Sequence, residues 1–203
     1  CDAVQGFLKV PCDPVGWGVD LMSLSAHKIG GPKGAGALYT APALRNLRPL
    51  LPGGGQEGGL RSGTEATAQI AGFARAVALR QENLAEKLRH MADIKAYCRE
   101  KLLSIPGVIP VGQGEAPHIL AVSLVGYPSA NIVTDLGAKG ICISAGSACH
   151  RGKASHVVSA LHLDKKTAAG VIRVSFGPET TRADIDGLYQ ALLDHKNQRF
   201  PML

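Results

Sequence analysis

Apolar and polar positions in the first part of the chain follow a short alternating pattern broken by glycine. An apolar-leaning run covers 19–24, the tetrad Ser25–Lys28 follows, and glycines dominate 30–36 before 37–39 resumes the apolar pattern. β-Strands favour such short runs, and glycine clusters favour turns. This order predicts a strand, a loop and a second strand, with the tetrad at the start of the loop.

The pattern changes to a helical period after Thr64. Apolar residues recur three or four positions apart and form two successive faces: Ile70, Phe73, Ala74, Val77 and Ala78, then Leu84, Leu88, Met91, Ile94 and Cys98. Glycine and proline are absent between Phe73 and Ser104. The spacing therefore predicts one long helix with room for a single kink, ended by Pro106 and Gly107.

Beyond Pro106 the pattern becomes short and mixed. It predicts strands at 118–124, 141–143 and 171–176, helices at 130–136 and 157–161, and a loop at 144–153. A final helix is expected to begin at Thr180 or Thr181, with Asp184 as the capping-box partner of Thr181. Strands that alternate with helices in this way indicate a compact α+β or α/β domain.

Composition and charge narrow the possible partners. The 203 residues carry a net charge of +6 with scattered Lys and Arg, and no basic run is interleaved with aromatic residues. This favours an ordinary solvated surface and argues against a nucleic-acid partner. No apolar run reaches the roughly 18 residues of a membrane helix, so a membrane location is not expected.

The five cysteines are Cys1, Cys12, Cys98, Cys142 and Cys149. Their odd number and the lack of a CxxC pair predict neither a disulfide framework nor a resident metal site. A reducing, cytoplasmic compartment fits this usage. Apolar neighbours predict that Cys98 and Cys142 are buried and structural.

Ser25-Ala26-His27-Lys28 is the first candidate for chemistry. A lysine amine can form a Schiff base with an aldehyde cofactor, and Ser25 and His27 could donate hydrogen bonds to its phosphate. Asp2 is a second candidate, because a carboxylate that pairs with a pyridinium nitrogen keeps the ring protonated. The alternatives are a surface lysine for Lys28 and a turn residue for Asp2.

Two further candidates lie near the end of the chain. Cys149 occupies a polar, glycine-flanked loop, where the neighbouring His150 and Arg151 would favour its thiolate, although an unremarkable surface cysteine is an equal alternative. Arg173 stands between apolar strand neighbours, so we expect its charge to meet a carboxylate. That carboxylate belongs either to a ligand or to a structural ion pair.

Taken together and in order, these stretches resemble the class V aminotransferase family, and within it the cysteine desulfurases of the nitrogen-fixation and iron–sulfur-cluster type. The resemblance is carried by DAVQ, DLMSLSAHKIGGPKGAGALY, GGGQEGGLRSGTEATAQIAGFARA, SAGSACHRG and IRVSFGPETTRADID. It implies an α/β fold of the aspartate-aminotransferase type (fold type I), represented by its C-terminal half. The corresponding division is part of the large domain at 1–63, a linking helix at 64–105 and a small α+β domain at 106–203.

The resemblance also implies roles for single residues. Lys28 would bind pyridoxal 5'-phosphate and move protons, Asp2 would pair with the ring nitrogen, and Gln5 would contact the phenolic oxygen. The phosphate would be held by Ser25 and His27, and by Thr64 from the neighbouring subunit of a homodimer. Arg173 would bind the substrate carboxylate. Cys149 would take the sulfur of L-cysteine as a persulfide, releasing L-alanine, and would make at most a transient iron–sulfur contact.

The implied partners are a sulfur acceptor or an iron–sulfur scaffold protein. The alternatives are a related selenocysteine lyase or class V aminotransferase, and, from another class, an inactive fragment or partner-binding module. Family members carry a preceding segment that supplies a ring-stacking histidine and further phosphate donors, whereas this sequence begins at Cys1. We therefore expect the chain alone to bind the cofactor weakly and to be nearly inactive.

Overall fold

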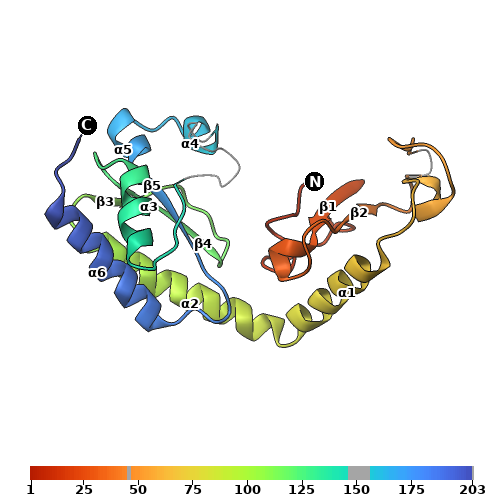
Figure 1. The fold of residues 1–203 in the computed structure, drawn as a ribbon, viewed down its shortest axis with the longest axis horizontal. Helices are drawn as coiled ribbons and strands as arrows, with labels where there is room; N and C mark the ends of the chain where they lie inside the picture. Colours follow the sequence, from red (N-terminus) through yellow and green to blue (C-terminus); the bar gives the residue numbers. More distant parts are fainter. Residues whose placement is uncertain (45–46, 146–155, 203) are drawn as a thin grey trace. The chain divides into compact units, whose positions relative to one another are not determined.

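The computed structural model describes residues 1–44, 47–145 and 156–202. It contains two compact units, Cys1–Leu84 and Ala85–Leu203 (Figure 1). The three-part division expected from the sequence concerns the complete fold and stays a prediction.

The first unit contains a two-stranded antiparallel sheet of β1 (Leu21–Ser25) and β2 (Gly36–Thr40). The register pairs Leu21 with Thr40 and Ser25 with Gly36, and the 3-10 helix η1 (Ala26–Ile29) follows β1 directly. A second 3-10 helix, η2 (Gln56–Gly59), lies between the sheet and the first α-helix. The predicted order of strand, loop and strand is confirmed.

The interval expected as one long helix is two helices. These are α1 (Thr67–Gln81) and α2 (Leu84–Leu103), and Asn83 between them has a φ of 52°. Asparagine adopts this left-handed conformation more readily than most residues, so the α-helix can end there without glycine or proline. The first unit ends at Leu84, one residue after this break.

The second unit contains an antiparallel sheet in the order β3-β4-β5. Its strands are β3 (Val108–Pro110), β4 (Ile119–Leu124) and β5 (Val171–Ser175). The longer helices of this unit beside α2 are α3 (Ser129–Ala138) and α6 (Arg182–Gln198), and the short ones are α4 (His156–Ala160) and α5 (Lys165–Ala169). Buried side chains from the sheet, α2, α3 and α6 form one continuous core, as an α+β domain requires.

The strand predicted at 141–143 is wrong, and so is the burial predicted for Cys142. These residues form no strand ladder, and pairing is limited to a bridge between Ser144 and Arg173. Ile141 and Ile143 pack against the core, whereas Cys142 between them is exposed. In extended backbone successive side chains point to opposite sides, so a cysteine between two inward isoleucines faces outward.

Cys98 on α2 is fully buried, as predicted. Removal from water disfavours the thiolate and raises the pKa of the Cys98 thiol to about 12. Such a thiol is unreactive at neutral pH, which agrees with a structural role.

The predicted start of the last helix is also confirmed. The Thr181 hydroxyl accepts a hydrogen bond from the Asp184 backbone N–H, and the Asp184 carboxylate accepts one from the Thr181 N–H. These reciprocal bonds satisfy two N–H groups that a helix N-terminus otherwise leaves without partners.

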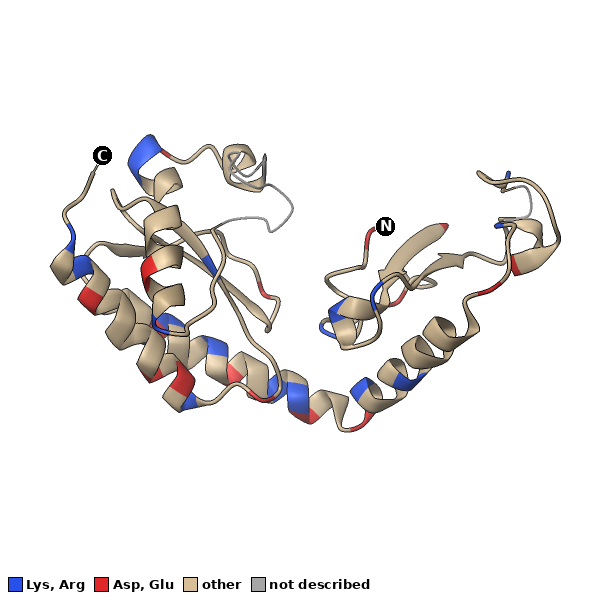
Figure 2. Ribbon diagram, in the orientation of Figure 1, with Lys and Arg blue, Asp and Glu red and all other residues tan. Residues whose placement is uncertain are grey.

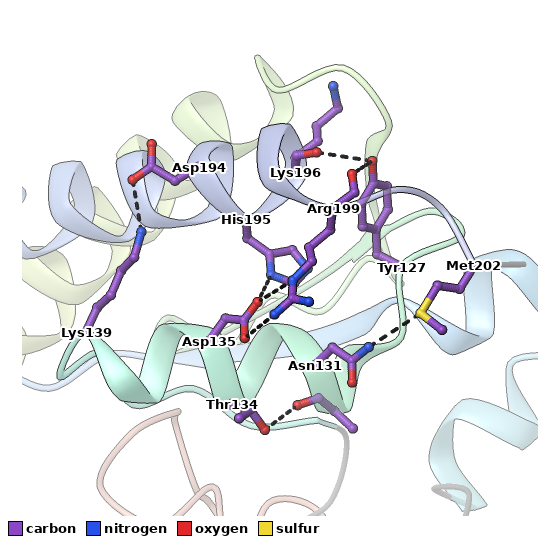
Figure 3. A network of polar contacts seen from close by, with 11 residues as sticks. Tyr127, Asn131, Thr134, Asp135, Lys139, Asp194, His195, Lys196, Arg199 and Met202 are labelled. Atoms are coloured by element: carbon purple, nitrogen blue, oxygen red, sulfur yellow. Dashed lines mark hydrogen bonds and ion pairs between the residues drawn. The ribbon is translucent and has the colours of Figure 1, made fainter.

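The far end of α6 is joined to α3 by a shared carboxylate (Figure 3). Asp135 on α3 accepts hydrogen bonds from His195 Nδ1 at 2.9 Å and from two nitrogens of Arg199 at 3.1 and 3.2 Å. The His195 side chain is only 2% exposed, whereas the Arg199 side chain is 57% exposed. The contact with Arg199, then that with His195, keeps the pKa of Asp135 below its usual range.

Charged side chains of both signs are mixed along α2 and α6 (Figure 2). This arrangement agrees with the solvated surface expected from the sequence. Among the residues that the structure describes, no helix combines the length and apolar character needed to cross a membrane.

Candidate functional site

Lys28 lies in a tight turn at the end of β1. Within η1, Ala26 and Ile29 are buried, Lys28 is half-buried and Gly30 closes the turn with a φ of 91°. The Gly31 N–H donates to the Ala26 carbonyl at 2.9 Å. Because the two buried neighbours anchor the turn, the position of the Lys28 backbone is fixed by packing.

Ser25 and His27 are joined directly beside this lysine. Ser25 Oγ and His27 Nδ1 are 2.7 Å apart in a hydrogen bond, with Ser25 as the last residue of β1 and His27 exposed. A hydroxyl and an imidazole N–H are both suitable donors to phosphate oxygens. The local geometry therefore groups an amine with two groups that can hold an anion.

Asp2 lies next to the same strand. The chain start pairs in parallel with β1 through Asp2 and Ser23, with Ala3 N–H donating to the Ser23 carbonyl at 3.1 Å. Asp2 Oδ1 accepts the Val4 N–H at 2.9 Å, which is the turn role named as the alternative. This hydrogen bond uses one oxygen of the Asp2 carboxylate. The other oxygen has its own lone pairs and can accept a hydrogen bond from a ligand. Asp2 is exposed.

The remaining cofactor candidates of this unit are also accessible. Gln5 is exposed in the turn after Asp2, and Thr64 is exposed in the segment between η2 and α1. The first unit thus presents an amine, a hydroxyl, an imidazole and a carboxylate at or beside one strand. These groups fit a phosphate-bearing aldehyde with a basic ring nitrogen, as pyridoxal 5'-phosphate is.

A buried lysine beside the site has no counterpart in the sequence predictions. Lys9 is 8% exposed, and its pKa is lowered to about 8, first by burial and then by the charges of Arg80 and Lys28. The available signal was its position between Leu8 and Val10 in an apolar stretch. A lysine at this position is equally consistent with a surface residue, so the pattern of residue types alone does not predict that Lys9 is buried.

In the second unit, Arg173 is held by Ser144. The Arg173 N–H donates to the Ser144 carbonyl at 2.8 Å, the Ser144 N–H donates to the Arg173 carbonyl at 3.1 Å, and Arg173 Nη2 donates to Ser144 Oγ at 3.3 Å. Within the described residues no carboxylate forms an ion pair with Arg173. The ion-pair alternative therefore finds no support in this part of the chain.

Cys149, the predicted sulfur acceptor, lies outside the described residues, as do His150 and Arg151. Its assignment stays a prediction. The structure brings Ser25, His27, Lys28 and Asp2 together within the first unit, and places Arg173 in the second unit.

Comparison with known proteins gives one consistent result. Residues 1–188 match the aminotransferase class-V family model. The mitochondrial cysteine desulfurase of Candida albicans is 38% identical over an alignment of 199 residues, which covers 94% of this chain and 40% of that protein. The cysteine desulfurase IscS of Clostridium botulinum is 36% identical over an alignment of 208 positions, which covers 99% of this chain and 52% of the relative.

Solved structures agree with the fold expected from the sequence. The NifS-like protein from Rickettsia africae superposes with a TM-score of 0.87 at 30% identity, covering 97% of this chain and 52% of the other. Another NifS-like protein has the same TM-score at 32% identity, with 98% and 52% covered. This chain has the mixed α/β architecture of these proteins and spans about half the length of the relatives it matches. The chain belongs to the class V aminotransferase family.

Proposed function

We propose that this chain is part of a pyridoxal-phosphate-dependent cysteine desulfurase that converts L-cysteine to L-alanine and transfers the sulfur to Cys149. The observation that carries the proposal is the hydrogen-bonded pair of Ser25 and His27 directly before Lys28, in a chain similar over nearly its whole length to cysteine desulfurases. The relatives are named cysteine desulfurases, which supports this activity over that of a selenocysteine lyase. The match of residues 1–188 to the aminotransferase class-V family model supports an enzyme over a partner-binding module.

In this proposal the first unit holds the cofactor. Lys28 would supply the amine that holds the aldehyde group and would carry a proton, while Ser25 and His27 would donate to the phosphate. Asp2 would pair with the ring nitrogen and keep it protonated. When bound, the cofactor supplies an electron sink for the charge that develops on the substrate.

Other contacts come from exposed side chains. Gln5 follows Asp2 and would donate to the phenolic oxygen of the ring. Thr64 would donate to the phosphate held by the partner subunit of a homodimer. Their exposure in the isolated chain supports a role toward a ligand or a second subunit.

The second unit supplies recognition of the substrate and the sulfur acceptor. Arg173 pairs with the carboxylate of L-cysteine, which the absence of a carboxylate partner among the described residues supports. The Cys149 thiolate would attack the sulfur of the bound substrate, so that an S–S bond forms while the C–S bond breaks and the substrate carbon keeps the bonding electron pair. The product carbon is then protonated, with Lys28 as the proton donor, to give L-alanine.

The persulfide on Cys149 would pass to a sulfur-acceptor or iron–sulfur scaffold protein. We place this reaction in a reducing compartment, and a cytoplasmic location is our proposal. The relatives include mitochondrial enzymes and a bacterial IscS, and both kinds support the assignment of the chemistry.

The test uses this chain co-expressed with the remaining half of the enzyme. Borohydride reduction followed by peptide mass mapping should place the pyridoxyl group on Lys28. Cys149→Ala should abolish sulfide release from L-cysteine while leaving cofactor incorporation intact, and Cys142→Ser serves as the matched control with unchanged release. A pyridoxyl group on another lysine, or undiminished release in Cys149→Ala, would overturn the proposal.

A further inference from the structure

Ser144 contacts the proposed substrate arginine through three separate hydrogen bonds. Two join the backbones of Ser144 and Arg173 in both directions, at 2.8 and 3.1 Å, and form an isolated antiparallel bridge beside β5. The third runs from Arg173 Nη2 to Ser144 Oγ at 3.3 Å. The backbone of Ser144 thus holds the backbone of Arg173, and the Ser144 hydroxyl holds the Arg173 guanidinium.

The guanidinium has few other constraints within the described residues. Arg173 Nε is buried and makes no hydrogen bond there, and Ser144 Oγ is the side-chain acceptor that the described residues offer to the group. An arginine side chain has four rotatable bonds, and a carboxylate binds its fork best when the plane of the guanidinium is fixed. A single hydroxyl acceptor at Nη2 therefore limits the orientations that the fork can take.

We propose that Ser144 is a positioning residue, which orients the Arg173 guanidinium toward the carboxylate of the amino-acid substrate. The inference rests on the proposed function, because it assigns Ser144 to the recognition of the same substrate. Ser144 touches no reacting atom in this scheme and acts through Arg173. Since alanine retains both backbone hydrogen bonds, Ser144→Ala removes the hydroxyl contact and leaves the bridge between the two segments in place.

The kinetic test uses the enzyme completed with its other half. Ser144→Ala should raise KM for L-cysteine about fivefold, the size expected for the loss of one ordinary hydrogen bond, with kcat within about twofold of wild type. Inhibition by L-alanine should weaken by the same factor, whereas inhibition by L-alaninamide, which lacks the carboxylate, should not change. Ser144→Thr keeps a hydroxyl and should restore both values.

A double-mutant cycle tests whether Ser144 acts on substrate binding through Arg173. In an Arg173→Ala background, Ser144→Ala should not weaken L-alanine binding further, because the two residues act as one unit. An additive loss, an equal loss for L-alaninamide, or an unchanged KM in Ser144→Ala would overturn the inference. If the wild-type enzyme releases no sulfide at all, the proposed function fails instead.

A spectroscopic measurement on the chain itself distinguishes failure of the inference about Ser144 from failure of the proposed function. In a ¹⁵N-labelled sample without cofactor, the hydrogen bond to Ser144 should slow rotation of the Arg173 guanidinium and shift its side-chain signals relative to those of Ser144→Ala. Ser144→Thr should keep the wild-type pattern. Identical Arg173 signals in wild type and Ser144→Ala would rule out the contact, whatever the enzymatic activity proves to be.

Discussion

Replacing Lys9 tests how strongly a buried charge beside the proposed cofactor lysine destabilises the first unit. Lys9 is 8% exposed, lies close enough to Arg80 and Lys28 to feel both charges, and forms no ion pair within the described residues. Lys9→Met keeps most of the length of the side chain and removes the charge. The apolar packing is largely preserved, so the change in stability reports mainly on the ammonium group.

The magnitude follows from the pKa. Burial, then Arg80 and Lys28, lowers the pKa of Lys9 from 10.5 to about 8. At about 1.4 kcal/mol per pKa unit, the protonated form is disfavoured in the folded state by about 3 kcal/mol. Lys9→Met should therefore raise the free energy of unfolding of the first unit at pH 7 by up to about 3 kcal/mol.

Urea unfolding followed by tryptophan fluorescence measures this effect. Trp17 is the one tryptophan of the sequence and belongs to the first unit, so its emission reports on the relevant part of the chain. Lys33→Met, at an exposed lysine, is the matched control. Its free energy of unfolding should stay within about 0.5 kcal/mol of wild type.

The pH dependence gives a second check with a defined sign. Between pH 8 and 10.5 the unfolded chain holds the Lys9 proton while the folded chain releases it, so wild-type stability gains from this group as pH rises. The advantage of Lys9→Met should be full below pH 8 and should disappear toward pH 10.5. An advantage that is absent at pH 7, or constant across this window, would refute the reasoning.

Two further predictions concern the second unit. Iodoacetamide at pH 8 should modify Cys142 in the folded chain and Cys98 only after denaturation. The reason is that Cys142 is exposed, whereas Cys98 is buried and its pKa is about 12. Equal labelling rates of the two cysteines, measured by peptide mass mapping, would contradict this. Thr181→Ala should cost roughly 1 kcal/mol of stability in urea unfolding followed by circular dichroism, because it removes a helix cap. Thr134→Ala is its control, since Thr134 lies inside α3 and its hydroxyl donates to the Ala130 carbonyl of the same helix. A similar loss there would show that capping is not the cause.

The sequence predicted best those features that depend on neighbouring residues. The capping box of Thr181 and Asp184 is local, and so is the turn that carries Lys28 between two strands. Each is set by side chains and backbone within a few positions, so a pattern of residue types suffices to predict it.

Features that depend on distant contacts were missed. The exposure of Cys142 depends on its neighbours Ile141 and Ile143, which pack against a core built from distant segments of the chain. The burial of Lys9 likewise depends on packing in the folded first unit. The sequence left room for one kink in the helical interval but did not predict its position at Asn83, because no glycine or proline marks it. The partnership of Ser144 with Arg173 likewise has no local signal, because a serine in a loop is common.

The carboxylate of Asp135 makes the attachment of α6 to α3 sensitive to acid. Its pKa is lower when folded than when unfolded, so its contribution is complete above the unfolded value and is lost as pH falls through the folded one. One protonation weakens the contacts to both Arg199 and the buried His195. Acid would therefore weaken the attachment of the last turn of α6 to α3. The first turn of α6 responds to acid as well, because hydrogen bonds from Thr181 keep the pKa of the capping-box carboxylate of Asp184 below its usual range.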